Sequence, residues 1–64
     1  KQLDLLCVDE NEAIVVDYKT GSSDRAGNEA QVSLYKRAVE QILGLKTRAF
    51  VVYCLSETTN IKEV

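Results

Sequence analysis

The chain has 64 residues, which is enough for one domain at most. Its residues are 45% hydrophobic and 28% charged, as in folded globular proteins. The net charge of −2 excludes a nucleic-acid binder that depends on a broadly basic surface, but not a site whose positive charge comes from bound metal. No apolar run approaches the roughly 18–20 residues of a membrane span, so we expect no membrane partner. Reduced cysteines make the cytoplasm the expected location.

A core of this size supplies only about 3–5 kcal/mol of folding stability. Chains this small usually need a disulfide, a metal or contact with a larger protein. The sequence has no histidine and no metal-binding cysteine spacing, and it begins at Lys1 rather than at methionine. We therefore expect residues 1–64 to be a fragment of a larger protein. Cys7 and Cys54 lie in apolar segments, which favours two buried reduced thiols; a disulfide or iron–sulfur ligation is the alternative.

The first predicted elements are two strands joined by a turn. Residues 3–8 form an apolar run, and residues 13–19 are rich in β-branched side chains. The polar residues 9–12 lie between them, which predicts an antiparallel hairpin. Residues 20–27 contain glycine, serine and aspartate and are predicted to form a loop.

A helix is predicted to follow this loop. Asn28 is a suitable N-cap, Gln31 completes a capping box, and Glu29 suits the positive end of the helix dipole. Gly44 predicts the end of the helix, because glycine readily adopts the left-handed conformation. Two neighbouring lines of apolar residues follow the helical period: Val32, Tyr35 and Val39, and Leu34, Ala38 and Ile42.

Residues 48–55 are predicted to form a third strand, with Ala49 and Val51 on one face and Phe50 and Val52 on the other. Both faces are apolar, so we expect a central strand that is covered on both sides. Residues 61–64 suggest a short further strand. Strand, helix and strand over residues 13–55 make a βαβ unit, so the expected fold is α/β: a mixed sheet with a β-hairpin, a crossover helix and a parallel strand. The second face of this sheet has no cover within the 64 residues.

The second strand carries two opposite charges near its end. Asp17 and Lys19 project from one face together with Val15, because residues two apart in a strand share a face. Such a pair is commonly a solvated ion pair worth less than about 1 kcal/mol. Asp4 favours a functional site, because a hairpin that turns near Glu10 brings this residue to the level of Asp17.

Two neighbouring carboxylates need a proton or a cation between them. A hard divalent metal with oxygen ligands, Mg²⁺ or Mn²⁺, suits Asp4 and Asp17, and the backbone carbonyl of Tyr18 adds a further oxygen. Lys19 would then lie beside the metal, where its amine is able to orient or help deprotonate a water or to neutralise charge on a phosphate.

Three sequence motifs together resemble the PD-(D/E)xK nuclease superfamily. They are Leu-Asp-Leu-Leu at 3–6, Ile-Val-Val-Asp-Tyr-Lys-Thr-Gly at 14–21, and Gln-Val-Ser-Leu-Tyr at 31–35. The set is similar to the nuclease domain of RecB- and AddA-type helicase–nucleases. The resemblance extends from Leu3 to about Tyr53 and implies a restriction-endonuclease-like α/β core, of which residues 1–64 would be a partial nuclease domain.

The resemblance also implies roles for individual residues. It makes Asp4 and Asp17 metal ligands and Lys19 the catalytic lysine, and it places Gln31 and Tyr35 beside the active site, where they help to position the lysine and the DNA backbone. The residues alone also allow a structural reading, in which Gln31 belongs to a capping box and Tyr35 to the core, and the two kinds of role are compatible.

The sequence departs from the family pattern in two ways. An upstream helix with a further acidic or histidine ligand is missing, and so is the glycine that often precedes Asp4. The two cysteines do not fit the family's iron–sulfur arrangement, so no cluster is expected on them.

The implied function is a Mg²⁺- or Mn²⁺-dependent deoxyribonuclease, an exonuclease within an ATP-dependent helicase–nuclease of DNA recombination and repair. Its partners would be DNA, a helicase domain of the same chain and a second helicase–nuclease subunit. The isolated fragment is expected to be inactive. Two alternatives stay open: a nuclease-like module that only binds DNA, and a structural α/β domain with coincidental motifs.

Overall fold

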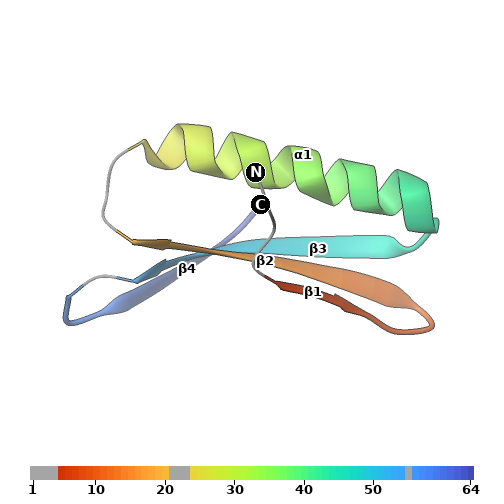
Figure 1. The fold of residues 1–64 in the computed structure, drawn as a ribbon, viewed down its shortest axis with the longest axis horizontal. Coiled ribbons are helices and arrows are strands. Elements are labelled where there is room, and N and C mark those ends of the chain that lie inside the picture. The colour runs from red at the N-terminus through yellow and green to blue at the C-terminus, as the bar shows by residue number, and fades with distance from the viewer. Residues whose placement is uncertain (1–4, 21–23, 55) are drawn as a thin grey trace.

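A computed structural model describes residues 5–20, 24–54 and 56–64 of the chain. Its elements in order are β1 (Leu5–Val8), β2 (Glu12–Thr20), α1 (Arg25–Leu43), β3 (Lys46–Cys54) and β4 (Thr59–Glu63). The strands form one mixed sheet in the order β1-β2-β3-β4, and α1 lies across one face of it (Figure 1). The predicted α/β class, hairpin, crossover helix and parallel strand are confirmed for the part described.

The hairpin turn is held by the side chain of Asp9. Its Oδ1 atom accepts hydrogen bonds from the backbone N–H groups of Asn11, at 2.7 Å, and Glu12, at 2.8 Å. These bonds favour the charged carboxylate and lower the pKa of Asp9 below its ordinary value. The turn sets the antiparallel register of β1 and β2, in which Val8 lies opposite Ala13.

The start of the helix differs from the prediction. Asp24, rather than Asn28, is the N-cap, and its carboxylate accepts a hydrogen bond of 3.0 Å from the backbone N–H of Gly27. Asp24 has a left-handed backbone with φ of 52°, a conformation that aspartate tolerates better than most residues. A Cβ atom on Gly27 would collide with the Asp24 carboxylate, so this glycine belongs to the cap rather than to a preceding loop.

The end and the buried face of the helix agree with the sequence. Gly44 is left-handed with φ of 66°, and its N–H donates to the carbonyl of Glu40 at 2.8 Å. Val32 is buried, and Tyr35 and Val39 pack against the core. The neighbouring apolar line faces outward, since Leu34 and Ile42 are exposed. Within the described residues, no helix is long and apolar enough to cross a membrane.

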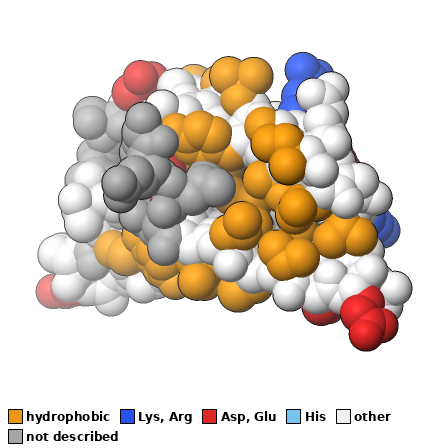
Figure 2. All heavy atoms as spheres, turned by 45° about the vertical axis from the view of Figure 1, so that its right-hand side comes forward, with side chains coloured by type: hydrophobic (Ala, Val, Ile, Leu, Met, Phe, Trp, Pro, Cys, Tyr) orange, Lys and Arg blue, Asp and Glu red, His pale blue; other side chains and the backbone are white. Residues whose placement is uncertain are grey.

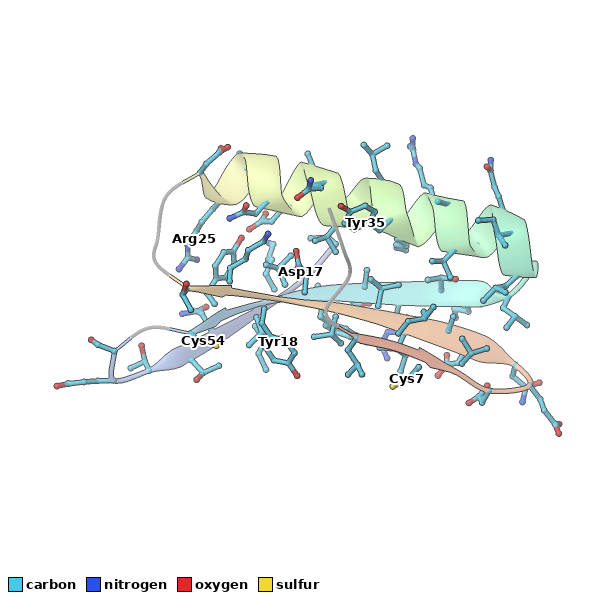
Figure 3. The ribbon with its side chains drawn as sticks, in the orientation of Figure 1. Cys7, Asp17, Tyr18, Arg25, Tyr35 and Cys54 are labelled. Atoms are coloured by element: carbon cyan, nitrogen blue, oxygen red, sulfur yellow. The ribbon has the colours of Figure 1, made fainter. Side chains whose placement is uncertain are left out.

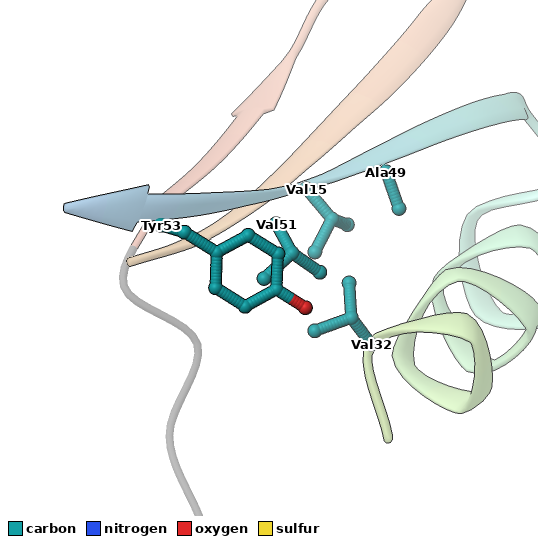
Figure 4. Packing of buried hydrophobic residues seen from close by; sticks show 5 residues of the cluster. All are labelled: Val15, Val32, Ala49, Val51 and Tyr53. Carbon is teal, nitrogen blue, oxygen red and sulfur yellow. The ribbon is translucent and has the colours of Figure 1, made fainter. Parts of the chain in front are cut away.

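The core lies between α1 and the sheet (Figure 4). Strands β2 and β3 run parallel, with Val15 beside Ala49 and Asp17 beside Val51. The buried cluster is Val15, Val32, Ala49, Val51 and Tyr53. Strand β4 pairs antiparallel with β3, so β3 is central as predicted.

The sheet face opposite α1 is open in the described part of the chain. The expectation that β3 is covered on both sides is therefore wrong there: Phe50 and Val52 are half-buried and Cys54 is exposed. The prediction of two buried thiols is also wrong, because Cys7 and Cys54 both project from the open face as free, exposed cysteines. Hydrophobic side chains are visible over much of the surface where the hairpin end of the molecule comes forward (Figure 2).

Candidate functional site

Asp17 and Lys19 form an ion pair on the helix-covered face of β2. The Lys19 Nζ atom lies 3.1 Å from Asp17 Oδ2, and the exposed fractions of the two side chains are 13% and 1%. Figure 3 shows Asp17 projecting from β2 into the space beneath α1. The predicted common face of Asp17, Lys19 and Val15 is confirmed, whereas the solvated ion pair considered as the alternative is excluded by the burial of Asp17.

The strand geometry explains how a charge comes to be buried here. Every second side chain of β2, at positions 13, 15, 17 and 19, points toward α1. The buried carboxylate of Asp17 therefore continues the line of Ala13 and Val15. Tyr18 points the other way and is 51% exposed, so its side chain lies on the open face. The role predicted for Tyr18 concerns only its backbone carbonyl, which no contact of the described residues tests.

The metal prediction depends partly on Asp4, which lies outside the described residues. The described register of the hairpin begins at the pair of Leu5 and Val16, so the convergence of Asp4 with Asp17 stays a prediction. Among the described residues, no group of three or more acidic, cysteine or histidine side chains is placed to hold a metal ion. The Asp17 carboxylate has the oxygen chemistry that Mg²⁺ prefers, but a complete site needs ligands beyond it.

A second polar group, which was not predicted from the sequence, lies beside the ion pair. Tyr53 is the β3 partner of Lys19 and is only 1% exposed. Its hydroxyl donates a hydrogen bond of 2.9 Å to Glu29 Oε2 on α1. The guanidinium of Arg25 lies over the Tyr53 ring, with its Cζ atom 4.1 Å from the ring centroid.

The environment of Tyr53 holds its hydroxyl in the protonated form. Burial raises the pKa of Tyr53, and the hydrogen bond to Glu29 and the negative charge of that residue raise it further. Arg25 acts in the opposite direction and lowers it. Tyr53 therefore serves as a hydrogen-bond donor to Glu29 near neutral pH.

The sequence contained a usable signal for this group. Arg25 and Glu29 are four residues apart and share a helix face when the helix includes Arg25, as α1 does. A helix that began after Asn28 would leave Arg25 in a loop and put Glu29 in the first helical turn. The structure instead has no acidic residue in the first turn of α1 and places Glu29 above Tyr53.

The helix residues Gln31 and Tyr35 are both half-buried. Tyr35 packs against the hydrophobic core, which supports its reading as a core residue. The capping-box reading of Gln31 is wrong, because the helix begins three residues before Asn28 and is capped by Asp24. Their roles in placing a lysine and a DNA backbone stay predictions.

Comparisons of the chain with protein-family models, curated proteins and solved structures found no match.

Proposed function

We propose that the chain is part of a metal-dependent DNA nuclease that hydrolyses phosphodiester bonds. The observation that carries this proposal is the burial of an Asp17–Lys19 ion pair at the end of a strand, under a helix. Burying two charges is costly, and such a pair is weak evidence for stability. Charged groups kept in a costly environment are instead typical of active sites.

The two side chains have complementary roles in this proposal. Asp17, with Asp4 and the carbonyl oxygen of Tyr18, would hold Mg²⁺ or Mn²⁺. When bound, this ion supplies positive charge that stabilises the phosphate undergoing attack. The ammonium of Lys19 is held at 3.1 Å from the Asp17 carboxylate, where it is placed to neutralise a phosphate oxygen or to orient a water. Gln31 and Tyr35 on α1 would help to position the lysine and the DNA backbone.

The partners follow from the resemblance to the helicase–nucleases. DNA is the proposed substrate, and a helicase domain of the same chain would deliver it, with a second helicase–nuclease subunit as a further partner. A helicase that feeds DNA to the site removes the need for a basic surface, which is consistent with the net charge of −2. The biological setting would be DNA recombination and repair.

The test is a nuclease assay on the full-length protein with Mg²⁺ or Mn²⁺. We expect Asp17→Ala and Lys19→Ala each to lower the cleavage rate at least about 100-fold, the scale of losing a positioned catalytic group. Lys62→Ala is the matched control, because Lys62 is an exposed lysine on the edge strand β4. Circular dichroism confirms that each variant is folded. Wild-type cleavage by both site variants would contradict the proposal.

The inactive DNA-binding module makes a different prediction in the same assay. It would bind DNA in all variants and cleave it in none, including the wild type. A titration with Mn²⁺ adds a second readout, because the structural-domain alternative predicts no metal bound near Asp17. We expect Mn²⁺ binding in the wild type and its loss in Asp17→Ala.

A further inference from the structure

Arg25 is an exposed cation whose position is fixed by an aromatic ring. Its guanidinium lies 4.1 Å from the centroid of Tyr53, a residue that is itself 1% exposed and therefore rigidly placed. Within residues 5–20, 24–54 and 56–64, Arg25 forms no ion pair. A guanidinium that stacks through its flat face keeps its N–H donors, which lie in its plane, available for a ligand.

The nearest helical partner for Arg25 is already engaged. Glu29 lies four residues further along α1, the spacing at which opposite charges on a helix usually pair. Its Oε2 atom accepts the hydrogen bond from the Tyr53 hydroxyl at 2.9 Å instead. Tyr53 thus supports the guanidinium with its ring and engages one oxygen of the Glu29 carboxylate with its hydroxyl.

This arrangement lies next to the proposed catalytic pair. Tyr53 is the cross-strand partner of Lys19, and the Lys19 amine contacts Asp17. Figure 3 shows Arg25 projecting from the start of α1 toward the sheet, on the same side of the sheet as Asp17. Two cations therefore lie on adjacent elements, one on β2 and one on α1, in a chain whose overall charge is negative.

We propose that Arg25 is a phosphate-binding residue for the DNA backbone, held ready by Tyr53 and Glu29 beside the Asp17–Lys19 pair. Arginine binds phosphate oxygens through two parallel N–H donors, so a guanidinium that is already oriented loses less conformational freedom on binding. The choice of DNA as the source of the phosphate depends on the proposed nuclease function, but the binding itself does not require catalysis.

The test measures DNA binding by the full-length protein in the absence of metal, so that no cleavage occurs. A labelled oligonucleotide is titrated at several salt concentrations between 50 and 200 mM. Losing one phosphate contact reduces the slope of log K against log salt by about 1. We expect this reduction, with a several-fold loss of affinity, in Arg25→Gln. A protein that is only less stable would not show a changed salt slope.

Three further variants separate the parts of the arrangement. Arg37→Gln is the matched control, because Arg37 is an exposed arginine on the same helix, and its slope should equal that of the wild type. Arg25→Lys should restore the slope, because it restores the charge. Tyr53→Leu should weaken binding because it removes the ring and frees Glu29, and Glu29→Gln in the same chain should recover part of the loss. Equal slopes for Arg25→Gln and Arg37→Gln would overturn the proposal.

Inorganic phosphate serves as the second ligand, since a free phosphate offers the same chemistry as the backbone. Competition with the oligonucleotide only at high concentrations, equally in wild type and Arg25→Gln, supports a DNA site. Tight binding of inorganic phosphate that depends on Arg25 would overturn the assignment to DNA.

The two proposals fail separately. A changed salt slope in Arg25→Gln together with wild-type cleavage in Asp17→Ala and Lys19→Ala would refute the nuclease and retain the phosphate contact. An unchanged slope together with lost cleavage in those two variants would refute the phosphate contact and retain the nuclease.

Discussion

The two faces of the sheet differ in a way that reverses the usual rule for charges and apolar groups. On the face under α1, the charged residue Asp17 is 1% exposed. On the opposite face, its neighbour Tyr18 is 51% exposed, and Leu5 of β1 is 42% exposed. Adjacent residues of one strand thus place a charge in the core and an aromatic ring in solvent.

The contrast shows that burial in this sheet does not simply follow hydrophobicity. Burying a carboxylate with its lysine brings little net stability, so the Asp17–Lys19 pair does not explain the stability of the covered face. The apolar side chains of the open face follow ordinary strand patterning, although the described residues include no second layer over them.

Removing one charge of the buried ion pair should lower the free energy of unfolding strongly, whereas removing both charges should lower it only weakly. We expect Lys19→Met to lower the free energy of unfolding by about 3 kcal/mol, because it removes the ammonium beside a carboxylate that is 1% exposed. The double variant Asp17→Leu with Lys19→Met should recover most of this stability, although it lacks both side chains of the proposed catalytic pair. Urea unfolding measures both, with Lys62→Met as the exposed control. A double variant no more stable than Lys19→Met would contradict the expectation.

The apolar residues of β3 allow the two faces to be compared without any charge. Val51 is buried under α1, whereas its neighbour Val52 is half-buried on the open face. We expect Val51→Ala to cost about 2 kcal/mol of unfolding free energy and Val52→Ala less than half of that, since the substitutions remove the same atoms from different environments. Urea unfolding measures the difference, provided that both variants show the same dependence of the unfolding free energy on urea concentration. Equal losses would show that a further layer covers the open face.

The smallest expected effect concerns the helix cap beside the site. Asp24→Ala should cost about 1 kcal/mol of unfolding free energy, because it removes the acceptor for the Gly27 N–H. Gly27→Ala should cost less than Asp24→Ala, because its Cβ atom would displace the same carboxylate while alanine stabilises a helix by about 1 kcal/mol relative to glycine. Thermal unfolding ranks the two variants, and a loss in Gly27→Ala as large as that in Asp24→Ala would contradict the expectation.

The order of elements was predictable because each has its own sequence period. Alternation in β2 and β3 and the helical spacing of Val32, Tyr35 and Val39 are local patterns that need no knowledge of the fold. The start of α1 was not predictable in the same way. Asn28 followed by Gln31 matches a capping box, and the real cap depends on a left-handed aspartate and on a glycine that leaves room for its carboxylate.

The part of the candidate site that lies on a single strand was predictable from the sequence, but the contacts between different elements were not. The shared face of Asp17 and Lys19 follows from alternation, and their burial follows once α1 covers that face. The contact between Tyr53 and Glu29 joins two elements whose mutual position no local pattern specifies. The exposure of Cys7 and Cys54 was missed for a related reason, because apolar neighbours in a strand do not show which face has a covering layer.

The parallel pairing of β2 with β3 also has a kinetic consequence. The β1–β2 hairpin joins residues separated by a short turn and is able to close within microseconds. Glu12 meets Lys46 only after the intervening helix has been placed, and contacts of such long range in sequence form slowly. Because Lys19 and Tyr53 lie on these two late-pairing strands, we expect the polar groups of the site to come together in the last stage of folding.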